Sequence, residues 1–271
     1  MNALERIVAT TRVEVARRRD AVPIGDLERA AAQRSADDPP RAFTDSLARP
    51  GLSLIAEHKR RSPSAGLIRD ELALQDVVGS YERGGAAALS ILTEGPSFGG
   101  SLDDLRSARA VASLPILRKD FVVDHYQVPE ARAAGADAIL LIVAALARDE
   151  LVRLHADAEA HGLAALVEVH DARELELAIE LGAQLIGINN RNLATLAVDT
   201  STTFTLAPSI PADRVIVAES GFRSRSELDE LAGAGVDAVL VGEALMRSPD
   251  IEAACRALVG NIDGRPTSRH S

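Results

Sequence analysis

The chain has 271 residues, 46% of them hydrophobic and only 3% aromatic, and its formal net charge is −10. This length and apolar content fit one large α/β domain with an aliphatic core, and the acidic balance argues against a nucleic-acid partner. Cys255 is the single cysteine and excludes an internal disulfide, and the longest apolar run (138–146) is far shorter than the roughly 20 residues of a membrane helix. With no apolar leader before Glu5, we expect a cytoplasmic protein without a membrane partner.

Residues 1–50 are predicted to form a helical extension. Apolar side chains recur at helical spacing from Leu4 to Val15, which predicts an amphipathic helix over residues 2–19. A second, short helix is expected over 25–33. We expect this extension to pack on the domain that follows rather than to fold by itself.

From about residue 52 to residue 258 one pattern repeats: a helix-like run ends at a glycine, and a continuously apolar strand follows. Glycine suits a helix C-terminus because it adopts the left-handed conformation at no steric cost. Continuously apolar strands are typical of parallel sheets that are covered on both faces. The predicted strands are 52–56, 86–92, 115–117, 138–142, 164–169, 184–188, 215–218 and 238–241.

Eight β–α units predict a parallel sheet with right-handed crossovers. The first strand is not followed by a Gly-x-Gly-x-x-Gly turn, which favours a closed (β/α)8 TIM barrel over the alternative, an open doubly wound sheet. We expect residues 1–271 to form a single domain, with the extension over 1–50, the barrel over about 52–258, and a polar tail over 261–271 that frays.

Active sites of such barrels lie at the carboxyl ends of the strands. Polar residues that finish or follow the predicted strands are therefore the candidates for chemistry. Glu57, Lys59, Lys119, Glu168 and Asn189 are expected to form a charged and polar ring around one mouth of the barrel.

The two lysines of this ring are the only lysines in the chain, whose other basic residues are all arginine. Arginine does not release a proton near neutral pH, whereas a buried lysine can. Lys59 and Lys119 therefore suggest proton or imine chemistry. The residue types alone leave two roles open, a Schiff-base nucleophile or a proton donor and electrostatic clamp.

Small residues at the ends of the last two strands predict a phosphate site. Ser220-Gly221 and Gly242-Glu243 lie where barrels commonly bind phosphate through backbone N–H groups, and Arg191 adds a charged fork.

Phe98 and Phe121 follow the second and third strands and favour an aromatic substrate over simple loop packing. His58 alternates with Glu57 and Lys59, so we expect it to point away from the barrel axis. No cluster of His, Cys, Asp and Glu has the spacing of a metal site, and no metal is expected.

Seven segments in the same order closely resemble the indole-3-glycerol phosphate synthase family, and the resemblance covers nearly the whole chain. They are IAEHKRRSPSAG (55–66), LSILTE (89–94), Phe98, LRKDF (117–121), VEV (167–169), GINNRNL (187–193) and AESG (218–221).

This resemblance implies a (β/α)8 carboxy-lyase of tryptophan biosynthesis that needs no cofactor. It would convert 1-(2-carboxyphenylamino)-1-deoxyribulose 5-phosphate into indole-3-glycerol phosphate, CO2 and water. The small phosphorylated substrate is the only partner implied. Both a monomer and a weak homo-oligomer remain open.

The resemblance also implies roles for the ring residues. Lys119 would be the general acid at the ribulosyl carbonyl, and Glu168 the general base of the dehydration. Lys59 would bind the substrate carboxylate with Glu57 as its partner, and Asn189 would hold hydroxyl groups. The division of proton transfers among Glu57, Lys59 and Lys119 stays open.

The remaining implied residues bind substrate, and the N-terminal extension is expected to lie over the mouth and contribute to this binding. Phe98, Phe121 and Leu140 would enclose the anthranilate ring. The implied set is completed by Ser62 and by the phosphate-binding residues Arg191, Ser220, Gly221, Gly242 and Glu243. Two positions depart from the family pattern, His58 and Asn190.

Three rival functions are less consistent with the sequence. A phosphoribosylanthranilate isomerase would need a cysteine where Glu57 stands. A Schiff-base aldolase would place its lysine at a middle or late strand end, where the sixth strand carries Asn189. A binding protein on an inactive barrel would have no reason to keep all four charged residues of the ring.

Overall fold

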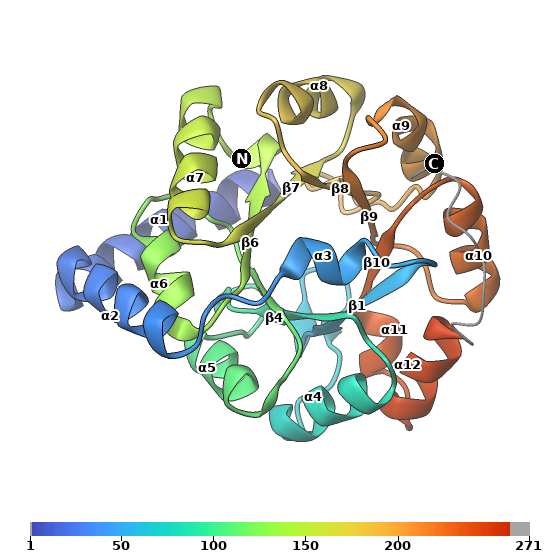
Figure 1. Cartoon of the computed structure of the whole chain (residues 1–271), viewed down its shortest axis with the longest axis horizontal. Helices are drawn as coiled ribbons and strands as arrows, with labels where there is room; N and C mark the ends of the chain where they lie inside the picture. Colours follow the sequence, from blue (N-terminus) through green and yellow to red (C-terminus); the bar gives the residue numbers. More distant parts are fainter. Residues whose placement is uncertain (1, 261–271) are drawn as a thin grey trace.

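A computed structural model describes residues 2–260 and shows eight parallel strands closed into a barrel, with helices around it (Figure 1). The order around the barrel is β1-β10-β9-β8-β7-β6-β5-β4, so the predicted TIM barrel is confirmed. The strands are β1 (Ser53–His58), β4 (Ala88–Leu92), β5 (Ile116–Lys119), β6 (Ala138–Ile142), β7 (Ala164–Val169), β8 (Leu185–Asn189), β9 (Val215–Glu219) and β10 (Ala238–Val241). A small antiparallel pair, β2 (Arg61–Ser62) and β3 (Gly66–Leu67), lies in the loop after β1.

The outer layer consists of helices that follow the strands. They are α4 (Leu74–Arg83), α5 (Leu102–Val111), α6 (Gln127–Ala134), α7 (Arg148–Ala160), α8 (Ala172–Glu180), α9 (Ser201–Leu206), α10 (Arg225–Gly233), α11 (Glu243–Met246) and α12 (Ile251–Val259), with 3-10 turns at Val143–Ala145 and Ala207–Ser209. No helix among residues 2–260 is long and apolar enough to cross a bilayer.

Side chains alternate along each strand and so build two cores. Outward residues such as Leu54 and Ala56 pack under the helices, whereas inward residues such as Ile55 and Leu117 fill the barrel. The inward row of most strands ends at the carboxyl edge in a polar residue, which places the chemistry at that mouth.

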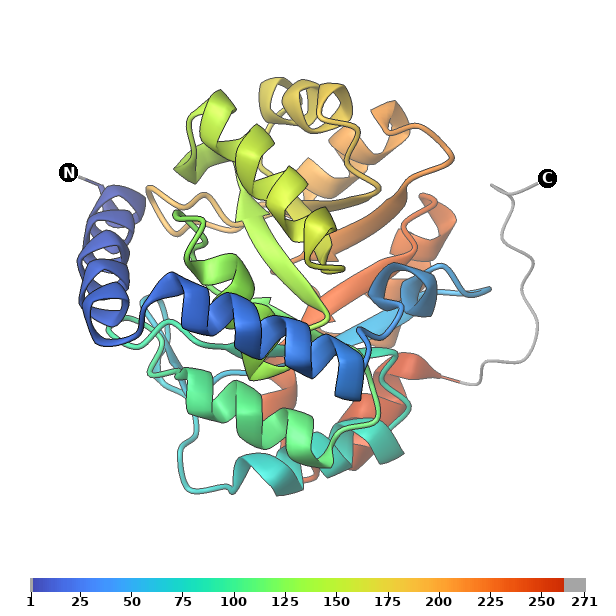
Figure 2. The ribbon, with the colours of Figure 1, turned by 60° about the vertical axis from the view of Figure 1, so that its left-hand side comes forward.

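The helices of the N-terminal extension are longer than predicted, and the extension contains a third helix. α1 (Ala3–Ala21) and α2 (Ile24–Asp37) run along the outside of the barrel (Figure 2). The expected helices over 2–19 and 25–33 were thus too short. α3 (Phe43–Leu47) was not predicted at all.

Helices α2 and α3 are attached to the barrel in different ways. α2 packs along α6, where the buried Arg132 donates a 2.9 Å hydrogen bond to the Ser35 hydroxyl. α3 lies across the amino-terminal end of the barrel (Figure 1) and inserts Phe43 and Leu47 into its inner core. The segment 261–271, which was expected to fray, lies outside the described residues.

Candidate active site

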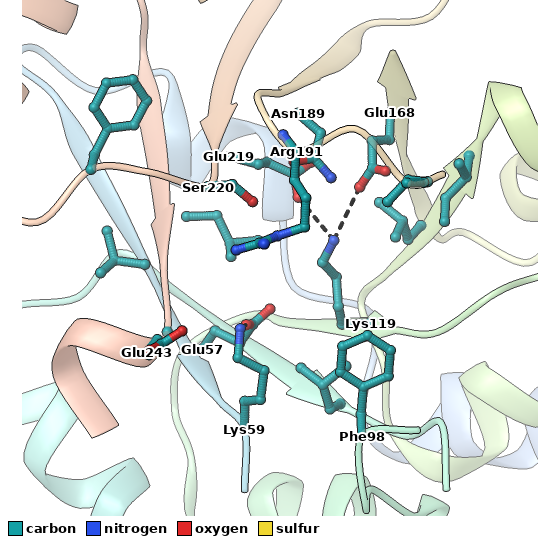
Figure 3. Close-up of a pocket in the computed structure, with 18 of the residues that line it drawn as sticks. Glu57, Lys59, Phe98, Lys119, Glu168, Asn189, Arg191, Glu219, Ser220 and Glu243 are labelled. Atoms are coloured by element: carbon teal, nitrogen blue, oxygen red, sulfur yellow. Dashed lines mark hydrogen bonds and ion pairs between the residues drawn. The ribbon is translucent and has the colours of Figure 1, made fainter. Parts of the chain in front are cut away.

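A pocket opens at the carboxyl ends of the strands and gathers the polar ring predicted from the sequence (Figure 3). Glu57, Lys59, Lys119, Glu168 and Asn189 all line it, although they are spread over 133 positions of the chain. Each belongs to the inward row of its strand or follows that row directly. The closed barrel therefore brings together groups that no local motif could.

At the centre of the pocket, the Lys119 ammonium lies between two buried carboxylates. Its Nζ donates to Glu168 Oε2 at 3.1 Å and to Glu219 Oε2 at 2.9 Å (Figure 3). Burial on its own would lower the pKa of Lys119, but the neighbouring carboxylates, Glu219 foremost, raise it well above its ordinary value. Lys119 is therefore a charged donor at neutral pH.

The two carboxylates around Lys119 differ in their proton affinity. Burial on its own would raise the pKa of Glu168, but nearby cations, Lys119 foremost, lower it well below its ordinary value. Burial raises the pKa of Glu219, and Lys119 offsets this only in part. Two carboxyl groups whose environments separate their pKa values can divide acid and base roles between them.

The second lysine is held by the first strand. Lys59 Nζ lies 2.7 Å from Glu57 Oε1, and the Ser90 hydroxyl donates to Glu57 Oε2 at 3.3 Å. A Cβ at Gly242 would lie 2.6 Å from Glu57 Oε1, so only glycine lets the last strand approach this ion pair. Glu57 is 3% exposed, and its fixed position orients Lys59 toward the pocket.

Of the predicted phosphate-binding residues, Arg191, Ser220, Gly242 and Glu243 line the pocket. Ser220 has a positive φ of 64°, which is uncommon outside glycine and marks a backbone held by its surroundings. Gly221 does not line the pocket. A Cβ on it would lie 2.6 Å from Thr200 Cγ2, so it permits the close approach of the β8–α9 loop instead.

An apolar wall faces the charged groups. Phe98 and Phe121 have ring centroids 6.3 Å apart at a tilt of 37°, and Leu140 lies beside them in the pocket. Ser62 does not line this pocket but an adjoining one, together with Leu4 of α1. The extension thus reaches the rim of the site.

Residues 4–258 match the sequence model of the family described as indole-3-glycerol phosphate synthase. The chain belongs to this family. It is 51% identical over 260 residues to an indole-3-glycerol phosphate synthase of Nocardioides sp., with 96% of this chain and 99% of the relative covered. It is also 47% identical over 262 residues to the synthase of Rhodospirillum rubrum, with 95% and 98% covered.

The fold is shared with more distant barrels. Thiamine phosphate pyrophosphorylase from Pyrococcus furiosus superposes with a TM-score of 0.59 at 19% identity, covering 79% of this chain and 98% of that one. A 3-hexulose-6-phosphate synthase superposes with a TM-score of 0.61 at 15% identity, covering 76% and 98%. At such identities the likeness concerns the barrel alone.

Glu219 was not among the residues predicted for the site of this synthase-family barrel. Two signals in the sequence point to it. Val215, Val217 and Glu219 alternate inward along β9, so Glu219 faces the mouth. Gly187 stands in a strand that is otherwise apolar until its last residue, and a Cβ there would lie 2.5 Å from Glu219 Oε1. A glycine inside a strand indicates such a close approach.

His58 and Asn190, the two departures from the family pattern, are both buried. His58 does not line the pocket, as expected, and burial and Arg60 lower its pKa to about 4. The Asn190 side-chain amide donates to the carbonyls of Glu219 and Ser220, both at 3.0 Å. Its oxygen accepts from the backbone N–H and the hydroxyl of Thr203. Asn190 thereby ties the predicted phosphate turn to α9.

Asn190→Ala is expected to raise KM about tenfold and to lower kcat less, because Ser220 loses the contact that holds its unusual conformation. The substitution also leaves Thr203 donors buried without their acceptor, so the free energy of unfolding should fall by about 2 kcal/mol. Steady-state kinetics and urea denaturation test both effects. Asn192→Ala is the matched control, since Asn192 is an exposed loop residue that lies outside the pocket lining. An equal rise of KM in both variants would contradict this role.

Proposed function

We propose that this chain converts 1-(2-carboxyphenylamino)-1-deoxyribulose 5-phosphate into indole-3-glycerol phosphate, CO2 and water in tryptophan biosynthesis. The observation that carries the proposal is the Lys119 ammonium, which lies between two buried carboxylates in the mouth of a synthase-family barrel. We also infer that residues 1–271 form a single domain, act in the cytoplasm, and have this small phosphorylated substrate as their partner.

The substrate fits the two faces of the pocket. Its anthranilate ring would pack against Phe98, Phe121 and Leu140, and its carboxylate would bind Lys59, which Glu57 orients. Its phosphate would bind at the opposite rim, through Arg191, Ser220 and the backbone N–H groups of Gly242 and Glu243. Gly221 would shape the turn, and Ser62 would act from the adjoining cavity.

Ring closure forms a bond between the ring carbon that carries the carboxylate and the ketone carbon of the sugar. Lys119 donates a proton to the ketone oxygen as that oxygen gains charge. Loss of CO2 then returns its bonding electron pair to the ring and restores aromaticity. The positively charged ring intermediate itself is the electron sink for this step.

Dehydration completes the indole. The new hydroxyl takes a proton from an acidic group of the pocket and leaves as water. Glu168 accepts the proton that the neighbouring methylene carbon releases. Asn189 would hold the hydroxyl groups of the intermediate while this occurs. The low pKa of Glu168 keeps this base ionised before the step.

The decisive experiment is turnover of the purified chain with the carboxyphenylamino-deoxyribulose phosphate, followed by indole fluorescence and by mass spectrometry of the product. We expect indole-3-glycerol phosphate and CO2 in equal amounts without any added cofactor or metal. Saturable binding of the compound without turnover would instead support a binding protein on an inactive barrel. Isomerisation of a phosphoribosylanthranilate would instead support a phosphoribosylanthranilate isomerase.

A further inference from the structure

His170 lies directly behind the Glu168 carboxylate, although the reaction proposed above does not use it. It follows β7 by one residue, so it shares the inward face of the strand with Glu168, two positions earlier. The ring nitrogen Nε2 lies 3.3 Å from Glu168 Oε1, and Nδ1 lies 3.0 Å from Glu174 Oε2. The imidazole thus bridges a carboxylate of the pocket and a carboxylate of α8.

The far side of this bridge is fixed by the start of α8. Asp171 caps the helix by accepting a 2.9 Å hydrogen bond from the Glu174 backbone N–H. Glu174 Oε2 in turn accepts from the His170 backbone N–H at 2.8 Å as well as from the ring. Reciprocal bonds of this kind hold a side chain at a helix N-terminus. The His170 ring is therefore held in one orientation by backbone geometry.

Nδ1 hydrogen-bonds Glu174 Oε2, whereas Nε2 lies at ion-pair distance from Glu168 Oε1, and neither of these last two atoms makes a hydrogen bond among the described residues. An imidazole presents a proton to both carboxylates only as the imidazolium. Burial on its own would lower the pKa of His170, but Glu168 and Glu174 raise it to about 10. The ionisable groups that face Glu168 are His170 beside it, Lys119 from β5 and, across that lysine, Glu219 from β9. At neutral pH, Glu168 therefore lies between two cations.

These two cations have different fates in the reaction. Lys119 faces the pocket and gives its proton to the substrate, whereas His170 lies behind Glu168 and keeps its proton. We propose that His170 is a positioning residue: its imidazolium fixes the Glu168 carboxylate and keeps it ionised after Lys119 has given up its proton. This inference rests on the proposed function and concerns the same site. Glu219 has no such second cation among residues 2–260. This explains why its pKa is raised, whereas the pKa of Glu168 is lowered.

The test is the pH dependence of kcat in His170→Asn. Without the imidazolium, a higher pH is needed to ionise Glu168, so we expect the acid limb of the profile to move up by at least about one pH unit. At pH 7, kcat should fall about tenfold because the Glu168 carboxylate is no longer fixed in place. KM should change less than about twofold, because His170 does not touch the substrate. A purely structural role would not move the acid limb.

His125→Asn is the matched control. His125 also pairs with a carboxylate, Asp157 at 2.7 Å, but it is half-exposed and does not line the pocket, so the pH profile of His125→Asn should match that of the wild type. Glu174→Gln is a second variant that keeps an acceptor for Nδ1 and removes its charge. We expect it to shift the acid limb in the same direction by a smaller amount, and it replaces His170→Asn if that variant does not fold.

A readout independent of activity is the ¹⁵N spectrum of the imidazole rings, with His170 assigned by its absence in His170→Asn. Both ring nitrogens of wild-type His170 should carry protons from pH 6 to pH 8. A neutral ring in that range, or an unmoved acid limb in an active variant, would overturn the inference. Wild-type protein that forms no indole-3-glycerol phosphate would reject the proposed function instead, and the spectrum would still decide the charge of His170.

Discussion

Replacement of Lys119 by alanine is expected to lower kcat for indole-3-glycerol phosphate formation by at least about 10²-fold. Lys119 is the ammonium that lies between Glu168 and Glu219 in the pocket, and ring closure needs an acid at the ketone oxygen. Without it, the two carboxylates face each other without a shared cation, and one of them takes up a proton. Indole fluorescence under saturating substrate measures the effect, with circular dichroism to verify the fold.

Lys119→Arg separates charge from proton transfer. Arginine keeps a cation between the two carboxylates but does not release a proton near neutral pH. We therefore expect this variant to fold with near-wild-type stability and to lose almost as much kcat as the alanine variant. Near-wild-type turnover of Lys119→Arg would mean that the position acts through charge alone and that another group donates the proton.

Borohydride distinguishes the proton donor from a Schiff-base nucleophile. Reduction in the presence of substrate traps an imine as a stable adduct on the lysine that formed it. Since Lys119 is held in its charged form by two carboxylates, we expect no adduct at Lys119 or Lys59. An adduct of substrate mass on either lysine, found by peptide mapping, would contradict the general-acid role.

The sequence predicted the barrel because its signals are local and repeated. A glycine that ends a helix and an apolar run that follows it need no tertiary information, and β6, β7 and β10 were predicted with the observed bounds. The ends of β1, β5, β8 and β9 were set too early, because the prediction stopped these strands where apolar residues stop, whereas the end of β4 was predicted correctly. In the structure the β1 ladder continues through Glu57 and His58, which pair with Ser90 and Ile91 of β4.

Elements that depend on distant partners could not be predicted. α3 is only five residues long, too short to be stable alone, and it exists because Phe43 and Leu47 fill the end of the barrel. His170 was not among the predicted site residues, since its position between two carboxylates follows from the start of α8. Glu219 could have been found from the alternation of inward and outward side chains, which was applied to Glu57, His58 and Lys59 of the first strand but not to β9.

Arg118→Leu is expected to lower the free energy of unfolding by about 3–5 kcal/mol, because it breaks a buried ion network. Arg118 points to the opposite face of β5 from Lys119 and is completely buried. Its guanidinium lies 2.9 Å from Asp120 and 2.9 Å from Glu130, and Glu130 also binds Arg18 of α1 at 2.7 Å. The substitution leaves Asp120, which is only 6% exposed, without its cation. Urea denaturation followed by circular dichroism measures the loss.

An exposed ion pair is the control with which the loss of stability in Arg118→Leu is compared. Arg106 pairs with Asp103 on the surface of α5, and Arg106→Leu should cost less than about 1 kcal/mol. Adding Asp120→Asn to Arg118→Leu removes the buried charge that has lost its cation and should recover part of the loss. Equal losses in Arg118→Leu and Arg106→Leu would show that the network contributes packing only. Arg118 helps to hold the Glu130 carboxylate, which in turn binds Arg18 of α1. Arg118→Leu should therefore loosen the extension that reaches the rim of the pocket, and KM should rise together with the loss of stability.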